Sequence, residues 1–326
     1  MKRRDVMFVL GSAVAIALSP LHPVAASAKE LAPIELPAGF QYPNGIARAS
    51  NSTLYVGSVT SGQILQIAPN GKIETLFPGN DEVFAATSLR LDEPRGILWG
   101  ASPDFLGTQP NSKTAPRPHR IFAIDVSSGK VKQVLQMPDR GFGNDIAIDA
   151  KGGVYVTDSN HPRIYYVPLG ATQLQTWIED NRLRFKGRVG LAGIALSANG
   201  SAIVNQFSDG KMFEVTPQPQ GRAMIEEVVL EYPLENPDGM QFDSNGLLLA
   251  IEGSVQSGNG RLLRIDLSAP NPKPIEVLAE NLISPVNLTT AGNEVWVTES
   301  QIRHRLLPGR ESQFPDRFFL RRFVLR

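Results

Sequence analysis

The sequence has no cysteine among its 326 residues. Disulfide bonds, thiolate metal sites and cysteine nucleophiles are therefore excluded. If the protein works in an oxidising compartment, its stability has to come from its packed core alone.

Net charge, long apolar runs and several catalytic motifs are also missing. The 32 Lys and Arg balance the 32 Asp and Glu, so charge gives no reason to expect a nucleic-acid partner. Beyond the N-terminus no stretch is long and apolar enough for a membrane helix. A Gly-x-Ser-x-Gly elbow, a His-Glu-x-x-His zinc motif and a phosphate-binding loop are all absent, which argues against serine hydrolases, zincins and nucleotide-binding enzymes.

The N-terminus has the pattern of an export signal. Lys2, Arg3 and Arg4 precede an apolar run over 6–18, and a small-residue cleavage site follows at 26–28. The arginine pair fits either a twin-arginine signal or an ordinary secretory signal. Cleavage after residue 28 would leave 29 basic and 31 acidic residues, a net charge of −2. We expect residues 1–28 to be removed and the mature chain to be periplasmic or secreted.

What is abundant is turn-forming residues and a repeat. The 29 Gly and 25 Pro make 54 residues that favour many short strands over long helices. Six segments share a first strand, a tight turn and a second strand. The first strands are expected at 43–48, 86–92, 144–149, 192–197, 238–243 and 286–290, and the second at 54–58, 97–101, 154–158, 202–206, 248–252 and 295–299.

The phase of this repeat is constant. The anchor residues Gly45, Ser88, Asp145, Gly193, Gly239 and Asn287 precede the end of the second strand by 13 residues in five segments and 12 in the sixth. Third and fourth strands follow in most segments. Four antiparallel strands in each of six units predict an all-β fold, a six-bladed β-propeller over residues 29–326. The segment 317–325 is expected to be a strand that helps to close the ring.

Blade geometry turns this repeat into a candidate site. The first strand is innermost, so the residue just before each anchor should face the mouth of the central channel. These pre-anchor residues are Asn44, Thr87, Asn144, Ala192, Asp238 and Val286. The ends of the second strands, Asp158, Gln206, Glu252 and Glu299, belong to the same face, and Asp145 lies beside Asn144. Side-chain oxygens of this kind suit calcium, although Asn, Asp and Gly also begin strands because they suit turns.

One loop on this face is long. It runs from Ser102 to His119, whereas the corresponding loops of the other blades are expected to have three to ten residues. It is either a lid over the channel mouth or a surface insertion. His119 and His161 fall in loops of this face, where each is either solvated or a proton-transfer group.

Two motifs carry a family resemblance. The segment GNDIAIDAKGGVYVTDSNHPRIY at 143–165 and the turn NPDGM at 236–240, in a six-blade phase, resemble the senescence marker protein/gluconolactonase/luciferin-regenerating enzyme family. The resemblance covers essentially all of the mature chain. It implies a lactonase or related hydrolase that depends on one divalent cation, calcium in the first place and zinc as the alternative.

The resemblance also implies a ligand set. Asn144 matches the asparagine of the family's Asn-Asp motif, and Asp238 matches the aspartate of Pro-Asp-Gly. Asn44 stands where the family has a glutamate, and Ala192 stands where it has an asparagine. Gln206, Asp158 and Glu252 are the oxygen-bearing side chains that would compensate for Ala192.

Two classes of function follow. The first is a hydrolase of lactones or related small esters, in which the cation held by Asn144, Asp238 and Asn44 polarises the carbonyl and Asp238 is the general base. Its substrate would be a lactone or a sugar acid derivative. The second is a non-catalytic propeller that uses the same face to bind a ligand or a partner, as Ala192 favours.

Overall fold

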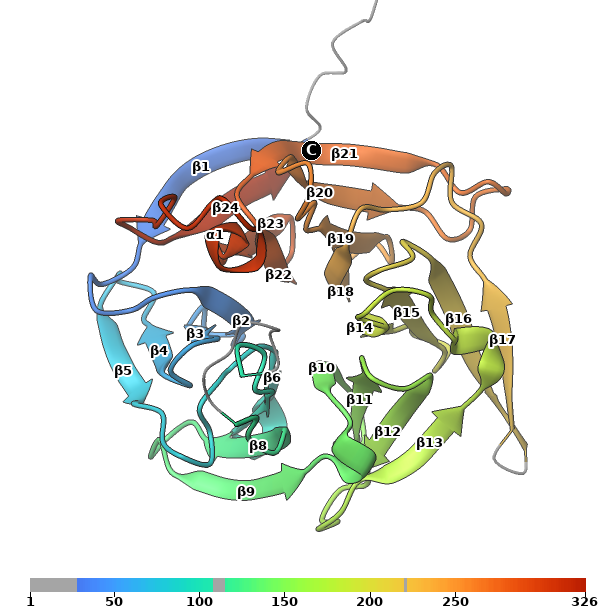
Figure 1. The fold of residues 1–326 in the computed structure, drawn as a ribbon, viewed down its shortest axis with the longest axis horizontal. Helices are drawn as coiled ribbons and strands as arrows, with labels where there is room; N and C mark the ends of the chain where they lie inside the picture. The colour runs from blue at the N-terminus through green and yellow to red at the C-terminus, as the bar shows by residue number, and fades with distance from the viewer. Residues whose placement is uncertain (1–27, 108–114, 220–221) are drawn as a thin grey trace, which may run out of the picture.

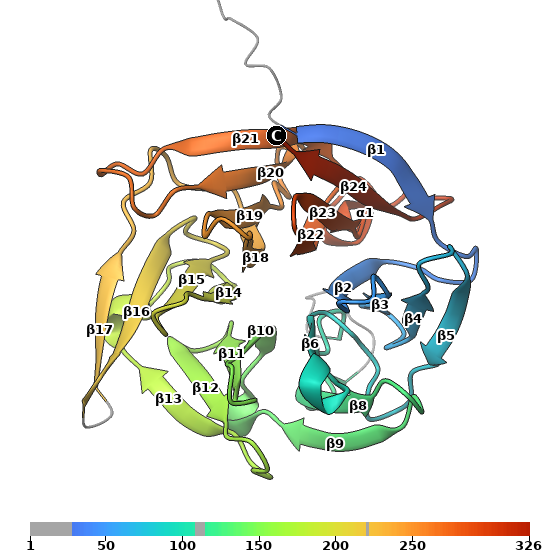
Figure 2. The same ribbon diagram turned by 180° about the vertical axis from the view of Figure 1, so that it is seen from behind.

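The computed structural model describes residues 28–107, 115–219 and 222–326. These residues form six antiparallel sheets of four strands each, arranged as blades around a central axis (Figures 1 and 2). The six-bladed propeller predicted from the repeat is therefore confirmed. The expected export signal lies outside the described residues, apart from Ala28. No helix in the described ranges combines the length and apolarity needed to cross a membrane.

The strands of the first three blades follow the repeat, except that β6 begins at Leu89, three residues later than expected. Blade 1 consists of β2 (Pro43–Arg48), β3 (Leu54–Ser58), β4 (Ile64–Ile67) and β5 (Ile73–Phe77). Blade 2 consists of β6 (Leu89–Asp92), β7 (Ile97–Ser102), β8 (Arg120–Asp125) and β9 (Val131–Gln136), and blade 3 of β10 (Gly143–Ile148), β11 (Val154–Asp158), β12 (Arg163–Val167) and β13 (Gln175–Glu179).

The other three blades have the same order from the axis outwards. Blade 4 contains β14 (Leu191–Leu196), β15 (Ala202–Gln206), β16 (Met212–Gln218) and β17 (Arg222–Glu227), and blade 5 contains β18 (Pro237–Phe242), β19 (Leu248–Glu252), β20 (Gly260–Ile265) and β21 (Ile275–Leu282). Blade 6 contains β22 (Pro285–Ala291), β23 (Glu294–Glu299), β24 (Phe319–Leu325) and β1 (Ala28–Glu35). The helical segments are η1 (Glu93–Arg95), η2 (Pro138–Arg140), η3 (Asn181–Leu183) and α1 (Arg303–Leu306).

The ring is closed by the two ends of the described chain. Strand β24 is the closing strand expected at 317–325, and β1 pairs with it along its outer edge, from Ala28 opposite Leu325 to Glu35 opposite Phe319. Arg321 of β24 forms ion pairs with Glu30 of β1 and with Glu299 of β23. Because the first and last strands share one blade, the ring cannot open without separating them.

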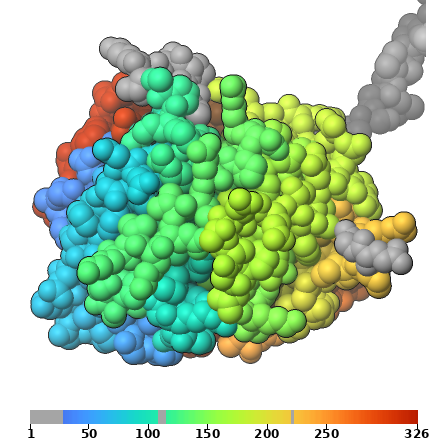
Figure 3. All heavy atoms as spheres, turned by 90° about the horizontal axis from the view of Figure 1, so that it is seen from below, coloured from blue at the N-terminus to red at the C-terminus, as the bar shows by residue number. Residues whose placement is uncertain are grey.

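The core lies between the blades. Each of six clusters of buried apolar side chains joins two neighbouring blades, and the last joins blade 6 to blade 1. Tyr55 and Ile64 of blade 1, for example, share a cluster with Leu98 and Phe122 of blade 2. The space-filling side view shows successive blades packed side by side around the rim (Figure 3). No blade buries both of its faces alone, so the propeller is one packed unit.

A β-bulge recurs where the innermost strand of a blade begins. In blades 1, 3, 4 and 5 the register shifts between the first and fourth residues of that strand, for example between Pro43 and Ile46 and between Pro237 and Met240. Blade 6 shifts between Pro285 and Asn287. A bulge bends a strand and changes the direction of a side chain. In blades 1, 3, 4 and 5 it coincides with the pre-anchor residue.

Candidate functional site

A pocket of about 440 Å³ lies on the axis at one face of the ring. Its volume is within the range of small-molecule sites. Five of the six pre-anchor residues line it, namely Asn44, Thr87, Asn144, Asp238 and Val286. The sixth, Ala192, is fully buried and is not among the lining residues. The innermost strands thus bring together residues that lie far apart in the sequence.

We call the pre-anchor residues Asn44, Asn144 and Asp238 the floor of this pocket. Hydrogen bonds between neighbouring blades hold this floor in place. The Thr298 hydroxyl of blade 6 donates to the carbonyl oxygen of Asn44 in blade 1 at 2.6 Å. The Asn205 amide of blade 4 donates to the carbonyl oxygen of Asp238 in blade 5 at 2.7 Å. These bonds fix the backbone at the pre-anchor residues and leave their side chains available to the pocket.

Close packing between neighbouring inner strands explains why three of the anchor residues are glycines. A Cβ atom on Gly239 would come within 2.5 Å of the Asn287 side chain in blade 6, and one on Gly45 within 2.8 Å of the Leu89 side chain in blade 2. A Cβ atom on Gly193 would collide with the carbonyl oxygen of Asp238. The Pro-Asn-Gly and Pro-Asp-Gly turns therefore end in glycine because neighbouring inner strands approach too closely for a side chain.

Asp238 is the chemically distinctive group of the pocket. Among the described lining residues it is the only carboxylate, and no histidine is present. Its carboxylate has no hydrogen-bond or ion-pair partner among the residues that the structure describes. Burial raises the pKa of Asp238 well above its usual range, and the negative charge of Asp145 raises it further. An uncompensated carboxylate of this kind favours a proton or a cation beside it.

The two asparagines differ in how they are held. The Asn144 amide nitrogen donates to the Ser159 hydroxyl at 2.9 Å, and that hydroxyl donates to the Leu191 carbonyl at 2.7 Å. This orientation leaves the Asn144 side-chain oxygen as an acceptor. The side chain of Asn44 forms no hydrogen bond within the described ranges. Both residues thus offer amide oxygens to a ligand of the pocket.

This donor set can be tested against a divalent cation. Asp238, Asn144 and Asn44 supply oxygen atoms only, which suits calcium, and the unpartnered Asp238 carboxylate would be compensated by it. The set has one negative charge, and Ala192 adds no ligand atom. No cluster of three or more His, Asp or Glu side chains that could hold a metal occurs among the described residues. The residues therefore fit a weakly bound hard cation with water among its ligands.

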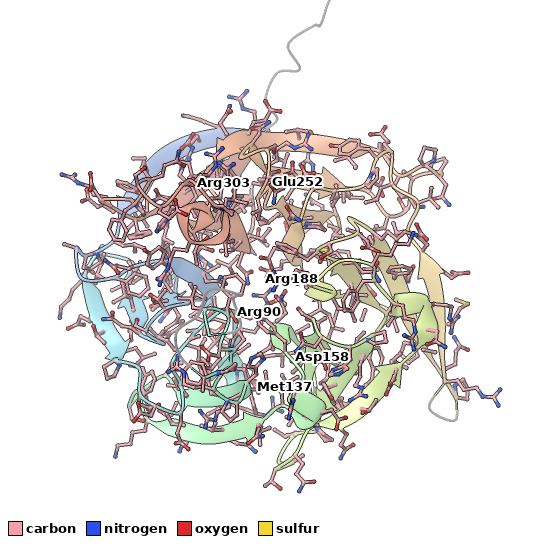
Figure 4. All side chains as sticks on the ribbon, in the orientation of Figure 1. Arg90, Met137, Asp158, Arg188, Glu252 and Arg303 are labelled. Atoms are coloured by element: carbon pink, nitrogen blue, oxygen red, sulfur yellow. The ribbon has the colours of Figure 1, made fainter. Side chains whose placement is uncertain are left out.

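The ends of the second strands lie outside the pocket lining and bind backbone. Asp158 accepts from the Phe142 amide at 2.8 Å, Glu252 from the Glu235 amide at 2.6 Å and Glu299 from the Ile283 amide at 2.7 Å. Gln206 donates to the Leu183 carbonyl at 2.8 Å. Glu252 and Glu299 also pair with Arg261 and Arg321. In four blades, therefore, the last side chain of the second strand is hydrogen-bonded to the segment that leads into the innermost strand. Figure 4 shows Glu252 away from the axis.

Asp145, predicted beside Asn144, forms a buried ion pair with Arg90 in the channel, and we call this pair the plug. The buried Asp145 carboxylate accepts from the Ser88 hydroxyl at 2.5 Å and from the Ile194 amide at 3.1 Å, and it pairs with Arg90 at 3.2 Å. Arg90 also donates to the Met240 carbonyl at 3.3 Å and to the Asn287 side chain at 3.4 Å. One guanidinium group therefore connects the inner strands of blades 2, 3, 5 and 6. It lies near the centre of the ring in Figure 4.

The two loop histidines are not among the residues that line the pocket. His119 is 9% exposed and meets the Phe142 ring edge-on, with 4.8 Å between centroids. His161 is more exposed, and its Nδ1 is 2.8 Å from the Asp158 carboxylate. The proton-transfer roles considered for them stay predictions.

His119 predicts a dependence of stability on pH. Burial lowers its pKa, with Asp104 and Asp158 partly offsetting this effect. The folded protein then binds fewer protons than the unfolded chain, whose histidine pKa is about 6.5. The stability contributed by neutral His119 is present above that pH and is lost as the pH falls below it. Melting curves from pH 8 to 5 should fall more steeply for the parent than for His119→Gln. Parallel curves over the whole range would contradict this account.

The long loop of blade 2 contributes to the pocket. The described ends of the predicted lid are 102–107 and 115–119, and Phe105 from this loop lines the pocket. The two described ends of this loop are joined by Asp104, whose carboxylate accepts from the Arg117 amide at 2.7 Å. The lid role stays a prediction.

The expectation of short loops in all other blades is wrong for blade 6. There residues 300–318 separate β23 from β24 and include α1, and Ile302 and Leu306 line the pocket. The third strand of this blade lies unusually far from the second, so the repeat alone gave no boundary for the loop.

Other pocket residues were missed from the sequence. Arg188, exposed in the segment that leads into β14, lines the pocket and lies near the axis in Figure 4. Nothing in the sequence distinguishes it from its neighbours Arg184 and Lys186. Arg90 had a visible signal, because it is a charged residue within an inner strand. The apolar lining comes mostly from loops, where no periodicity marks it.

Sequence comparisons find no relatives. No protein-family model matches the chain, and no curated protein matches it in sequence.

Solved structures do match the fold. A gluconolactonase from Xanthomonas campestris is 15% identical, covers 92% of this chain and 90% of its own, and has a TM-score of 0.63. A luciferin-regenerating enzyme is 13% identical over 90% and 95% of the two chains, with a TM-score of 0.61. Virginiamycin B lyase from Staphylococcus aureus is 19% identical over 83% and 81%, with a TM-score of 0.57.

These likenesses concern the fold. The propellers that the sequence resembles are among its structural neighbours, which confirms the resemblance at that level. The same fold also occurs in a lyase, so the reaction of this protein has to be argued from its own pocket.

Proposed function

We propose that this protein is a hydrolase of lactones or related small esters that acts in the axial pocket. The observation that carries the proposal is the Asp238 carboxylate, which is unpartnered among the described residues and shares the pocket floor with Asn144 and Asn44. The gluconolactonases among the structural neighbours support the same class of reaction.

In this mechanism Asp238 is the general base. It takes a proton from a water molecule whose oxygen attacks the carbonyl carbon of the lactone. The ring C–O bond then breaks, and the proton passes to the leaving alkoxide, so that the product is a hydroxy acid. Asn144, oriented by Ser159, and Asn44 position the polar part of the substrate.

A divalent cation is part of the proposal. Asp238, Asn144 and Asn44 would hold calcium, or zinc as the alternative, with water completing the ligands. When bound, the cation would polarise the carbonyl and stabilise the oxyanion. With a single carboxylate, we expect an affinity on the order of 10⁻⁴–10⁻³ M, as for weak calcium sites.

The alternative is a propeller that binds a small molecule in this pocket without turnover. Ala192 favours it, because the third ligand position of the related hydrolases has no oxygen here. In either case we propose export through the N-terminal segment and a small-molecule ligand.

The first experiment combines metal binding and turnover. Thermal stability is measured with a chelator and with added calcium or zinc, and a panel of lactones is then screened. We expect millimolar calcium to raise the melting temperature and to support hydrolysis. A metal-dependent shift without turnover would favour the binding alternative, and no shift with either metal would remove the cation from both proposals.

A further inference from the structure

The wall of the pocket is mainly apolar, with the exposed Arg188 as its charged member. Every blade contributes at least one large apolar side chain to the lining: Val59, Phe105, Phe142, Phe207, Val255 and Ile302, in blade order. The polar floor and the apolar wall therefore form one continuous cavity.

Strand register places this wall beyond the floor. Ser58 and Glu252 end their strands opposite Pro43 and Pro237, which directly precede the floor residues Asn44 and Asp238. Val59 follows Ser58, and Val255 lies three residues beyond Glu252, in the loops that continue away from the sheet. A ligand whose polar group reaches the floor thus has the rest of its body against the wall.

The side chain of Arg90 lies across the channel. The Arg90 guanidinium bridges the inner strands of blades 2, 3, 5 and 6. The part of the ligand that does not contact the floor must therefore extend outwards.

Several polar lining groups are already engaged. The Ser159 hydroxyl bonds to Asn144 and Leu191, and the Ser300 hydroxyl donates to the Ser284 carbonyl at 3.1 Å. The Asn160 amide nitrogen donates to the Arg140 carbonyl at 2.9 Å. Beyond Asn44, Asn144 and Asp238, the buried Ser284 hydroxyl, which has no partner among the described residues, and the exposed Arg188 side chain are available to a ligand. A polyhydroxylated ligand would still leave most of its hydroxyl groups without partners against this wall, which is unfavourable.

We infer that the pocket selects lactones that carry an unsubstituted hydrocarbon chain over sugar lactones. This inference rests on the proposed function. The lactone carbonyl would lie at the floor near Asp238, and the chain would cover the apolar wall and displace water from it. Each methylene that becomes buried should improve kcat/KM about threefold to fourfold.

The test is a series of substrates of increasing chain length. The calcium-loaded protein is assayed with γ-butyrolactone, γ-hexalactone, γ-octalactone and γ-decalactone, and with glucono-δ-lactone. We expect kcat/KM to rise along the series and glucono-δ-lactone to be the poorest substrate. Equal values along the series, or a preference for glucono-δ-lactone, would overturn the inference and leave the proposed function standing.

A variant locates the effect in the wall. Val255→Thr keeps the shape of the side chain and replaces a methyl group by a hydroxyl group, so it should lower kcat/KM for γ-decalactone several-fold more than kcat/KM for γ-butyrolactone. The matched control is Val229→Thr, at a residue that is 46% exposed and outside the pocket. A chain-length dependence that Val255→Thr does not change would contradict the role of the wall.

A binding measurement separates this inference from the proposed function. Alkyl cyclopentanones have the ring carbonyl and the chain but no ester bond, and their affinity is measured by calorimetry. If no lactone is hydrolysed but binding tightens with chain length, the proposed function fails and the apolar selection stands. If binding is independent of chain length, the selection fails whatever the turnover.

Discussion

Asp238→Asn is expected to lower kcat/KM for lactone hydrolysis by about 10²- to 10⁴-fold, the usual contribution of a general base. Asp238 is the only carboxylate among the described pocket residues, and no histidine there can replace it. Asparagine keeps the shape of the side chain, and the bond from Asn205 to the backbone carbonyl does not depend on the carboxylate. The fold should therefore be preserved.

The same variant should be at least as stable as the parent when no metal is present. Burial and Asp145 raise the pKa of Asp238, so at neutral pH its ionisation opposes folding. This contribution favours the folded state at low pH and is lost as the pH rises through the raised pKa. Asparagine removes the cost, and it should also abolish stabilisation by calcium. The measurements are initial rates and melting curves with and without calcium.

The control for this variant is Asp139→Asn, at an exposed carboxylate that pairs with Arg163 outside the pocket. It should retain the activity of the parent. If Asp238→Asn hydrolyses lactones as fast as this control, the assignment of the general base is wrong.

Arg90→Met is expected to cost about 3 kcal/mol in the free energy of unfolding, at the lower end for breaking a buried ion pair. The Arg90 side chain is 14% exposed and that of Asp145 is 1% exposed. Methionine would leave the Asp145 carboxylate with its bonds to Ser88 and Ile194 but without a counter-charge. Four blades would also lose their shared hydrogen-bond donor at the axis.

Urea denaturation of a double-mutant cycle tests this prediction. Adding Asp145→Asn to Arg90→Met should recover part of the loss, because the uncompensated charge is removed. The control is Arg317→Met, whose pair with Glu35 is exposed on both sides and should contribute 1 kcal/mol or less. If Arg90→Met costs no more than Arg317→Met, the plug does not stabilise the ring.

Part of the candidate site followed from the repeat. The alternation of apolar residues and the constant spacing placed Asn44, Asn144 and Asp238 at equivalent positions of three inner strands, and all three line the pocket. Asp158, Gln206, Glu252 and Glu299 were placed by the same pattern on the same face. The repeat did not reveal that their side chains bind the backbone of the incoming segment, because that contact depends on which way each side chain turns.

The blades, their order and the residues at the channel mouth were determined by the sequence itself, because strand periodicity and tight turns are local properties of the chain. Tertiary structure alone decided that β1 completes the last blade, that Arg90 bridges the inner strands of four blades and that Phe105 and Ile302 help to form an apolar wall. Those features depend on segments that lie far apart in the chain and meet only when six sheets close around one axis, and no local pattern records such meetings.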